Sequence, residues 1–330
     1  MTSSMAMIRA RKALQAAGFD SGLHLERASS VTNEVWLADD MVIRINTQCD
    51  HRLRREMLLT GALPDCIGYP PVIEYGGDLG SDWLIVGRLP GQPLSRAWPT
   101  MSVDQRRQAI SQLAERLKAL HTVEAPRVEG LVYQPQLLDR APNGEAAVAR
   151  LRDAIRTAGR LHNVDPGVML DVDHLVHQSA SVLEPFDGTT LVHGDLTFEN
   201  LLWDGEHLAL LDFEWARPGP PDLDLDVLLR FCAYPFLHVA PDYEHLTLAA
   251  DYAPVPYWLQ EDYPELFSHR RQFERVQLYS IAWDVQELLR FPPLTAVALL
   301  HEHHPYNRLM RLLRGVSYLD QMNGNVPINL

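Results

Sequence analysis

Three side chains that carry oxygen donors, Asp195, Asn200 and Asp212, lie in one short stretch of the chain beside apolar residues. The apolar run Leu208–Leu211 ends directly at Asp212, and two leucines follow Asn200. A carboxylate that emerges from an apolar strand is costly unless it is paired, hydrogen bonded or bound to a cation. Mg²⁺ meets that need, because it prefers oxygen ligands and keeps waters and phosphate oxygens beside a few protein ligands. The pattern therefore predicts a centre that holds Mg²⁺ together with phosphate groups.

The spacing of these residues is similar to that of a known pair of loops. The segment that begins at His193 reads His-Gly-Asp-Leu-x-x-x-Asn-Leu-Leu, and the run that ends at Glu214 reads Leu-Leu-Asp-Phe-Glu. The joint pattern resembles the aminoglycoside phosphotransferase/choline kinase family, which has a protein-kinase-like fold. The resemblance is sharpest over residues 190–230, and the expected order of elements covers nearly the whole chain. It implies an α+β, bilobal fold with a small antiparallel β-sheet N-lobe and a larger, mostly helical C-lobe.

The resemblance also implies roles for the residues of the two loops. Asp195 would be the catalytic residue, which orients and deprotonates the hydroxyl group of an acceptor molecule as a general base or a hydrogen-bond anchor. Asn200 and Asp212 would hold the Mg²⁺ ions that bridge the phosphates of ATP or GTP. His193 would brace its loop through hydrogen bonds.

Further residues would bind the nucleotide if the resemblance holds. Arg44 would neutralise the α- and β-phosphates, and Glu56 on the following helix would fix the Arg44 side chain. Arginine stands here in place of the commoner lysine, which keeps the charge but changes its geometry.

Two other departures from the family pattern concern the phosphate-covering loop and the metal loop. Residues 28–33 occupy the phosphate-covering loop without a glycine, so backbone N–H groups and the hydroxyls of Ser29 and Ser30 are its expected phosphate ligands. Asp-Phe-Glu replaces Asp-Phe-Gly, so Glu214 either adds a carboxylate near the metal or points towards the substrate.

The elements that must position these residues fall into two regions. Five strand-like runs, punctuated by Gly, Asp and Asn, precede residue 90, with a helix from about residue 51 to residue 63. The runs are Leu23–Arg27, Glu34–Ala38, Met41–Asn46, Val72–Gly76 and Trp83–Leu89. Beyond the Pro- and Gly-containing connector that starts at Leu89, Ser102 and Gln105 have capping-box spacing, and apolar residues then recur with the helical period. We therefore expect a nucleotide-binding β lobe over residues 1–89, and a helical lobe over residues 90–330 that carries the catalytic loop, the metal loop and the acceptor site.

Composition limits the class of protein. The chain has 330 residues, a net charge of −14 and three cysteines that lack ligand spacing. Its apolar runs are too short to cross a bilayer, and the N-terminal residues resemble a short helix rather than a signal peptide. Separated thiols fit reduced cysteines in a cytoplasmic protein. The negative charge disfavours nucleic acid and membrane as partners, and it fits plain solubility or a cationic acceptor equally well. Nothing in the sequence separates a monomer from a dimer.

For three other segments, the sequence allows both a functional and a purely structural interpretation. The acids of Asp222–Asp226 lack the glycine turn and distal glutamate of a calcium loop, so a helix start with Asp222 or Asp224 as cap or brace is favoured. His301–Pro305 lacks metal-ligand spacing and Pro305 is expected to end any helix there, so a solvated loop is favoured. Aromatic and acidic side chains gather over residues 234–265. Either a core with a solvated acidic face or a pocket for a basic or sugar-bearing acceptor explains them.

The leading hypothesis is an enzyme, an O-phosphotransferase that moves the γ-phosphoryl group of ATP or GTP, held with Mg²⁺, to a hydroxyl of a small molecule. Aminoglycoside-like antibiotics fit as acceptors, while other antibiotics, metabolites and choline-like alcohols stay open. A non-catalytic nucleotide-binding regulator on the same scaffold is the alternative. A protein kinase is disfavoured, because no Ala-Pro-Glu segment follows and few residues separate Asp212 from Asp222.

Overall fold

The computed structural model describes residues 2–28, 30, 33–126, 131, 136–138, 141–186, 188–240 and 243–323 of the chain. The chain forms two compact units, each made of segments that are distant in sequence. The first unit comprises Met1–Gln134, His193–Ala216 and Phe236–Thr247, and the second comprises Pro135–Val192, Arg217–Pro235 and Leu248–Leu330. These units do not coincide with the lobes expected on either side of residue 89, and that functional division stays a prediction.

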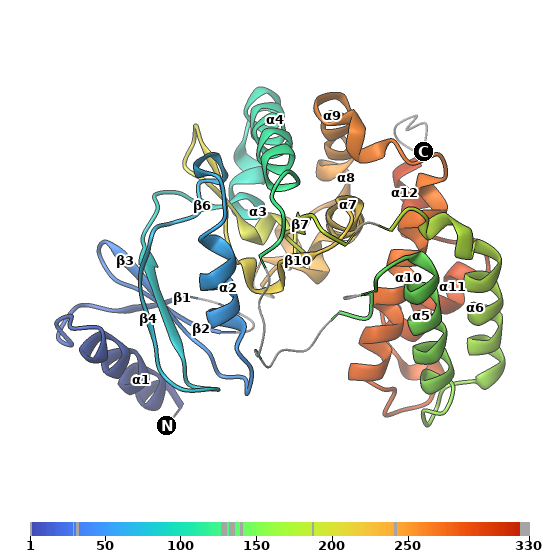
Figure 1. Ribbon diagram of the computed structural model, residues 1–330, viewed down its shortest axis with the longest axis horizontal. Coiled ribbons are helices and arrows are strands. Elements are labelled where there is room, and N and C mark those ends of the chain that lie inside the picture. The colour runs from blue at the N-terminus through green and yellow to red at the C-terminus, as the bar shows by residue number, and fades with distance from the viewer. Residues whose placement is uncertain are drawn as a thin grey trace. The chain divides into compact units, whose positions relative to one another are not determined.

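A five-stranded antiparallel sheet with the strand order β1-β2-β3-β5-β4 lies in the N-terminal part of the first unit (Figure 1). Its strands are β1 (Glu26–Ala28), β2 (Glu34–Leu37), β3 (Met41–Ile45), β4 (Val72–Gly76) and β5 (Trp83–Gly87). Each strand overlaps the range that the sequence predicts for it, and β4 matches its range fully. The predicted small antiparallel sheet is confirmed.

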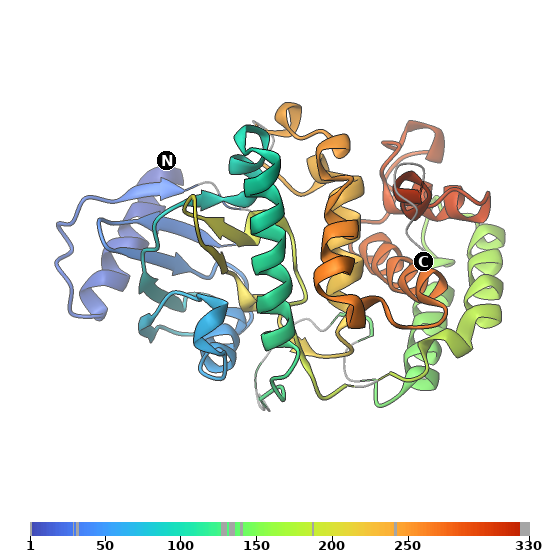
Figure 2. The same cartoon turned by 90° about the horizontal axis from the view of Figure 1, so that it is seen from above.

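Two helices, α1 (Thr2–Ala16) and α2 (Arg52–Thr60), cover opposite faces of this sheet in both views (Figure 1, Figure 2). Ile43 of β3 belongs to the apolar cluster under α1, whereas Leu84 of β5 belongs to the cluster under α2. Because successive side chains of a strand point to opposite faces, Arg44 lies on the face that α2 covers. The sheet thereby brings Arg44 to the helix that carries its predicted partner.

A second, three-stranded sheet in the first unit has the order β6-β8-β9. Its strands are β6 (Gln92–Pro93), β8 (Leu201–Trp203) and β9 (Leu208–Leu210), and the helices α3 (Leu94–Ala97) and α4 (Val103–Leu120) belong to the same unit. The side chain of Ser102 accepts the N–H of Gln105, whose own side chain accepts the N–H of Ser102. This capping box at the start of α4 confirms the sequence prediction.

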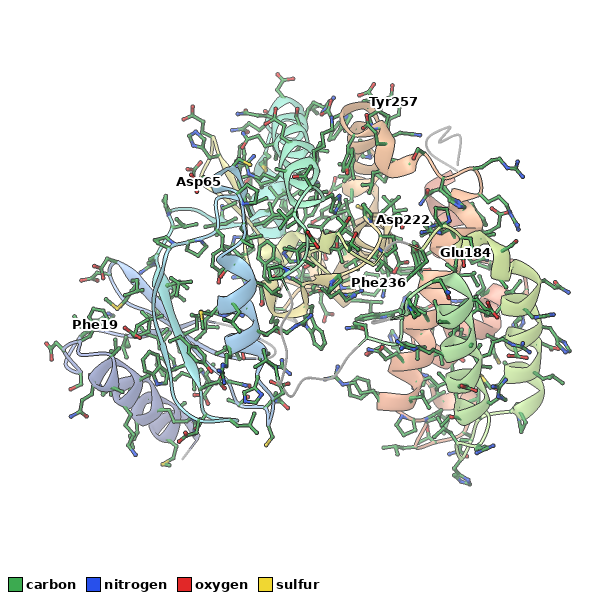
Figure 3. The ribbon with its side chains drawn as sticks, in the orientation of Figure 1. Phe19, Asp65, Glu184, Asp222, Phe236 and Tyr257 are labelled. Atoms are coloured by element: carbon green, nitrogen blue, oxygen red, sulfur yellow. The ribbon has the colours of Figure 1, made fainter. Side chains whose placement is uncertain are left out.

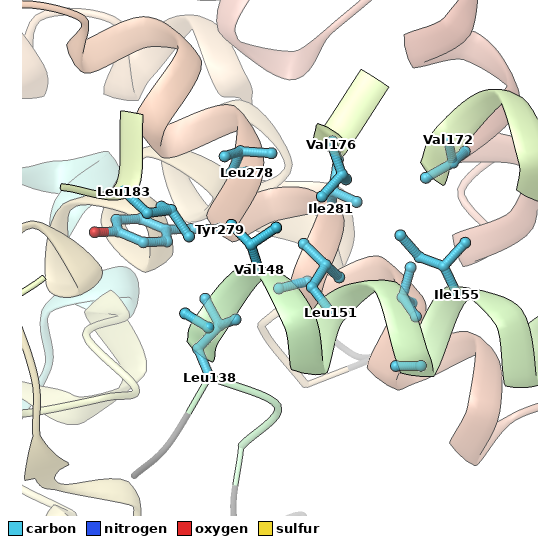
Figure 4. Packing of buried hydrophobic residues seen from close by; sticks show 14 of the residues in the cluster. Leu138, Val148, Leu151, Ile155, Val172, Val176, Leu183, Leu278, Tyr279 and Ile281 are labelled. Atoms are coloured by element: carbon cyan, nitrogen blue, oxygen red, sulfur yellow. The ribbon is translucent and has the colours of Figure 1, made fainter. Parts of the chain in front are cut away.

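The second unit is mainly helical. Its helices are α5 (Gly144–Ala158), α6 (Pro166–Ser179), α7 (Asp222–Ala233), α8 (Ala249–Tyr252), α9 (Val255–Asp262), α10 (Gln272–Arg290), α11 (Pro305–Leu313) and α12 (Tyr318–Asn323), and the short strands β7 (Leu191–Val192) and β10 (Arg217–Pro218) pair antiparallel. Leu151 of α5, Val176 of α6 and Ile281 of α10 are buried in one core cluster (Figure 4). The helical remainder and the small sheet together confirm the predicted α+β class.

Asp222 is the first residue of α7, which confirms the predicted helix start (Figure 3). Its buried carboxylate accepts hydrogen bonds from Arg275 Nε at 2.5 Å and from Tyr279 Oη at 2.9 Å. Asp222 therefore braces α7 against α10 through its side chain, as the structural alternative expects.

Residues 301–304 form no helix, which agrees with the loop expected there, but Pro305 begins the helix α11 and does not end one. Proline suits this position, since the first turn of a helix leaves its N–H groups without helical partners. The ring Nδ1 of His304 accepts the N–H of Tyr306 at 3.2 Å and so caps the helix. Among the helices described, none combines the length and the apolar character that crossing a lipid bilayer requires.

Candidate active site

The hairpin of β8 and β9 brings Asn200 and Asp212 to one end of the first unit's small sheet. Leu201 pairs with Leu210, and one step beyond this pair the N–H of Leu211 donates to the carbonyl oxygen of Asn200 at 2.9 Å. Asp212 follows directly. The two residues predicted to hold Mg²⁺ therefore leave adjacent strands at the same end of the hairpin.

Asn200 also fixes Asp195. The Nδ2 of Asn200 donates to Asp195 Oδ2 at 2.9 Å and to the carbonyl oxygen of Asp195 at 2.8 Å. Because the amide nitrogen serves Asp195, its oxygen Oδ1 is the atom that remains for an acceptor or ligand role. The structure therefore brings together Asp195, Asn200 and Asp212, the three residues on which the sequence prediction depends.

The imidazole of His193 is fully buried and supports the loop that carries Asp195 and Asn200. Its Nε2 lies 2.9 Å from the carbonyl oxygen of Leu211, which can only accept, so Nε2 carries the proton. The other nitrogen, Nδ1, then accepts the backbone N–H of Asp195 at 3.3 Å. The centroid of the imidazole ring also lies 4.6 Å from the centroid of the Phe213 ring. The geometry supports a bracing role, because both nitrogens contact the backbone of the catalytic and metal loops.

Arg44 links Glu56 with Asp212. Its Nη1 donates to both carboxylate oxygens of Glu56 at 2.6 Å, and its Nη2 donates to Asp212 Oδ1 at 2.7 Å. Burial lowers the pKa of the Arg44 guanidinium, but the carboxylates of Asp212 and Glu56 outweigh this effect and hold that pKa well above its usual value. Arg44 is therefore a fixed positive charge beside the carboxylate predicted to hold Mg²⁺.

Glu56 is fully buried and accepts two further hydrogen bonds. The hydroxyl of Tyr69 donates to Glu56 Oε1 at 2.9 Å, and the backbone N–H of Phe213 donates to the same atom at 3.1 Å. Burial raises the pKa of Glu56, while the Arg44 charge lowers it. Because every one of these contacts is a donor, the ionised form of Glu56 satisfies them all. Glu56 thus ties Arg44 to the backbone of the metal loop.

Asp212 and Glu214 differ sharply in exposure, although they are two residues apart. Asp212 adopts a left-handed backbone conformation with φ of 61°, and 28% of its side chain is exposed. The side chain of Glu214 is only 2% exposed, and burial together with the Asp212 charge raises the pKa of Glu214 to about 8. The exposed carboxylate is suited to a ligand, and the buried one to contacts within the protein.

The contacts of Glu214 were not foreseen from sequence. Asn33 Nδ2 donates to Glu214 Oε2 at 2.7 Å, and Arg52 Nη1 donates to Glu214 Oε1 at 3.4 Å. Arg55 Nη1 donates to the carbonyl oxygen of Glu214 at 3.2 Å. Arg52 and Arg55 share a face of α2 with Glu56, because residues three and four positions apart lie above one another on a helix. That spacing is the sequence signal that could have identified both arginines.

The predicted phosphate-covering segment is described in part. Ser29 lies outside the described residues. Ser30 is exposed, and its hydroxyl donates to the carbonyl oxygen of Asn33. Its role as a phosphate ligand stays a prediction, as do the roles of Arg44, Glu56, Asp195, Asn200 and Asp212.

The residues at the end of the hairpin fit Mg²⁺ by the chemistry of their donors. Within the described ranges, no group of three or more His, Cys, Asp or Glu side chains is placed to hold a metal ion. The expected protein ligands are one amide oxygen, from Asn200, and one carboxylate, from Asp212. Mg²⁺ in phosphate-transfer sites commonly takes one or two such ligands and completes its shell with waters and phosphate oxygens.

Comparisons with known proteins show the family and the fold of this chain. A curated relative, an aminoglycoside 3'-phosphotransferase from Streptomyces ribosidificus, is 28% identical over 179 residues, which cover 50% of this chain and 59% of the relative. A solved structure of a choline/ethanolamine kinase family protein from Mesorhizobium loti superimposes with a TM-score of 0.60 at 17% identity, over 98% of this chain and 99% of that one.

A second solved structure, a streptomycin–ATP ternary complex of the aminoglycoside phosphotransferase APH(2")-IIa, has a TM-score of 0.57 at 14% identity and covers 91% of this chain and 93% of that one. At these identities the two structures show a shared protein-kinase-like fold. The model of the phosphotransferase enzyme family matches residues 29–258, which include strands β2 to β5 and the segment from His193 to Glu214. The chain therefore belongs to the phosphotransferase enzyme family.

Proposed function

We propose that this protein transfers the γ-phosphoryl group of a nucleoside triphosphate to a hydroxyl group of a small molecule. One observation carries the proposal. The amide of Asn200 holds the carboxylate of Asp195, while the pairing of Asn200 with Leu211 sets Asp212 at the same end of the hairpin. A general base and a pair of oxygen ligands are thereby grouped in one unit, as phosphoryl transfer requires.

Each residue of the site has a separate role in the reaction. Asp195 accepts the proton of the acceptor hydroxyl as a bond forms between the acceptor oxygen and phosphorus, and the bond from phosphorus to the leaving nucleoside diphosphate breaks. Asn200 holds the Asp195 carboxylate in one orientation. Arg44 supplies a permanent positive charge to the phosphates, and Glu56 keeps that charge in place. Mg²⁺, when bound by Asn200 and Asp212, would neutralise charge on the phosphate oxygens.

An aminoglycoside is the acceptor class that we propose first. The family relatives include a 3'-phosphotransferase named for aminoglycosides and a structure that contains streptomycin with ATP. The net charge of −14 favours such cationic molecules. A choline-like alcohol is the second candidate, because the choline/ethanolamine kinase family protein shares the fold over nearly the whole chain. ATP and GTP are both proposed donors.

A phosphotransfer assay tests the proposal. The purified protein with Mg²⁺ and either ATP or GTP is incubated with aminoglycosides, choline and ethanolamine, and phosphorylated acceptor is detected by its mass. We expect one acceptor class to gain a phosphate, and Asp195→Asn to lower kcat by about 10²- to 10⁴-fold, the usual contribution of a general base. Asp39→Asn, at an exposed turn of the first unit, is the matched control and is expected to retain wild-type kcat.

The rival function is a nucleotide-binding regulator without catalysis. It predicts that Mg²⁺ and nucleotide stabilise the protein against heat, while no acceptor in a broad panel gains phosphate. Equal turnover by the wild type and Asp195→Asn would also contradict the proposed mechanism, because the carboxylate would then do no chemistry.

A further inference from the structure

Two departures from the family pattern meet in the structure. The phosphate-covering segment lacks glycine, and Glu214 stands where many protein-kinase-like folds have glycine. Asn33, at the end of that segment, bonds to the side chain of Glu214. We propose that Asn33 and Glu214 are a pair of positioning residues that fasten the β2 end of the phosphate-covering segment to the metal loop and so position that end for the nucleotide phosphates. This inference rests on the proposed function of the same site.

The contact is short, buried and long-range. Asn33 Nδ2 lies 2.7 Å from Glu214 Oε2, across 181 positions of sequence. Both residues are buried, with 6% of Asn33 and 4% of Glu214 exposed. Asn33 directly precedes β2, and Glu214 lies two residues after Asp212. A hydrogen bond to a buried carboxyl group is stronger than one in water, so this bond restrains both loops.

Glu214 is itself held from the side of α2. Arg52 donates to its Oε1 at 3.4 Å, Arg44 lies 3.6 Å from its Oε2, and Arg55 donates to its backbone carbonyl at 3.2 Å. The backbone and the side chain of Glu214 are therefore both fixed. Glu214 can act as a rigid anchor for Asn33, because its own position is set by three arginines of the sheet and of α2.

The orientation of the Asn33 side chain depends on its hydrogen bond to Glu214. Its Oδ1 is buried and has no hydrogen-bond partner among the described residues, so the bond to Glu214 orients the amide. Removing the Glu214 side chain would leave the buried Nδ2 without this acceptor, which is costly. The hydroxyl of Ser30 donates to the carbonyl oxygen of Asn33, so the anchor also restrains part of the segment ahead of it.

The functional consequence is a smaller entropic cost of nucleotide binding. A glycine-rich loop must be ordered when the nucleotide arrives, and that ordering subtracts from affinity. Asn33, which is already fastened to Glu214, loses less freedom on binding. The absence of glycine from residues 28–33 and the presence of Glu214 are thus two parts of one arrangement.

Nucleotide binding measured by calorimetry with Mg²⁺ and ADP tests the pair. We expect Asn33→Ala and Glu214→Ala each to raise the Kd by about five- to tenfold, the loss of one hydrogen bond to a buried carboxyl group. The double variant should bind no more weakly than Glu214→Ala alone, because the bond from Asn33 is already lost in that single variant. Glu214→Gln keeps an oxygen that can accept from Asn33, so it should recover most of the affinity lost in Glu214→Ala.

Steady-state kinetics and heat denaturation complete the test. The KM for nucleotide should rise with the Kd, while the KM for acceptor stays unchanged. Glu206→Ala, at an exposed turn of the same unit, is the matched control. A purely structural role would lower the melting temperature without changing the Kd, and would contradict the inference. Glu214→Gln as weak as Glu214→Ala would also overturn it, since the charge and not the hydrogen bond would then matter.

These outcomes are separable from failure of the proposed function. If the wild type binds Mg²⁺ and ADP but phosphorylates no acceptor, the coupling between Asn33 and Glu214 can still be measured, and the phosphotransfer proposal alone fails. If the wild type binds no nucleotide, both proposals are wrong.

Discussion

Arg44 contacts two carboxylates with one guanidinium group. Its two terminal nitrogens point in different directions, so Nη1 serves Glu56 while Nη2 serves Asp212. A lysine carries a single ammonium group on a flexible stem and cannot present two nitrogens in a fixed plane. Arg44 therefore also neutralises the partly exposed carboxylate of Asp212. The need to contact two carboxylates at once explains why arginine, and not the commoner lysine, stands at position 44.

We predict that Arg44→Lys impairs nucleotide use more than catalysis. The lysine keeps the charge for the phosphates but loses either the Glu56 contact or the Asp212 contact, so its position is less fixed. The KM for nucleotide should rise by about tenfold, which corresponds to about 1.4 kcal/mol of lost binding, with a smaller change in kcat. Steady-state kinetics at saturating acceptor measure both quantities.

Arg314→Lys is the control for this substitution, because Arg314 is an exposed residue after α11. It should leave both constants unchanged. An Arg44→Lys variant with wild-type KM would show that one contact suffices, and the geometric argument for arginine would fail.

At the scale of elements, helices and strands with strong local patterns could be predicted from sequence. The capping box at Ser102 and the apolar period of α4 are local signals, and the structure confirms both. The pair of Asn33 and Glu214 could not be predicted, because nothing near either residue indicates a partner 181 positions away. The start of α11 was missed for another reason. Proline is compatible with the first turn of a helix as well as with the end of one.

Helices α5 and α6 are joined by an ion pair with a predictable dependence on pH. Arg152 donates to Asp173 through two nitrogens, with Nε 2.8 Å from Oδ1 and Nη2 2.7 Å from Oδ2. These hydrogen bonds lower the pKa of Asp173 below its usual value. A carboxyl group whose pKa falls on folding stabilises the protein above its unfolded pKa, near 3.9, and loses that contribution as the pH falls through the folded value.

We therefore predict that Asp173→Asn lowers the free energy of unfolding at pH 7 by about 1 kcal/mol, the upper range for a partly exposed pair. The difference from wild type should persist at pH 6 and shrink below about pH 4, as Asp173 becomes protonated first in the unfolded state and then in the folded state. Urea denaturation at several pH values measures it.

Asp153→Asn in α5, the helix that carries Arg152, is the matched control. Asp153 pairs with Arg156, but both side chains are largely exposed, with 54% of Arg156 and 72% of Asp153 accessible. Exposed pairs contribute little, so this variant should remain within about 0.5 kcal/mol of wild type at every pH. An Asp173→Asn difference that is constant down to pH 3 would show that packing, and not the charge of Asp173, stabilises the pair.

At the scale of the whole molecule, the proposed catalytic groups are confined to one unit. Arg44, Glu56, Asp195, Asn200 and Asp212 all belong to the first unit, which has its own apolar clusters around the five-stranded sheet. The second unit has a separate core built from α5, α6 and α10. The segment 193–216, which follows α5 and α6 in the sequence, thus belongs to the same unit as the sheet that carries Arg44, and its strands β8 and β9 pair with β6 in a separate sheet.

The net charge of −14 is a property of the whole chain, and it leads to a prediction about acceptors. A negatively charged protein attracts cations over several ångströms, and salt screens this attraction, with a Debye length of about 10 Å at 0.1 M ionic strength. We expect the kcat/KM for a multiply charged aminoglycoside to fall severalfold, by roughly two- to tenfold, between 0.05 and 0.3 M KCl. The kcat/KM for a singly charged choline-like acceptor should fall less with salt, because the attraction scales with acceptor charge.

The KM for the nucleotide provides an internal control. Salt also screens the repulsion between the protein and the phosphates, so the KM for the nucleotide should not rise as salt lowers the kcat/KM for the acceptor. If the salt response is the same for acceptors of different charge, the acidity of the chain serves solubility alone, and the electrostatic argument for a cationic acceptor is lost.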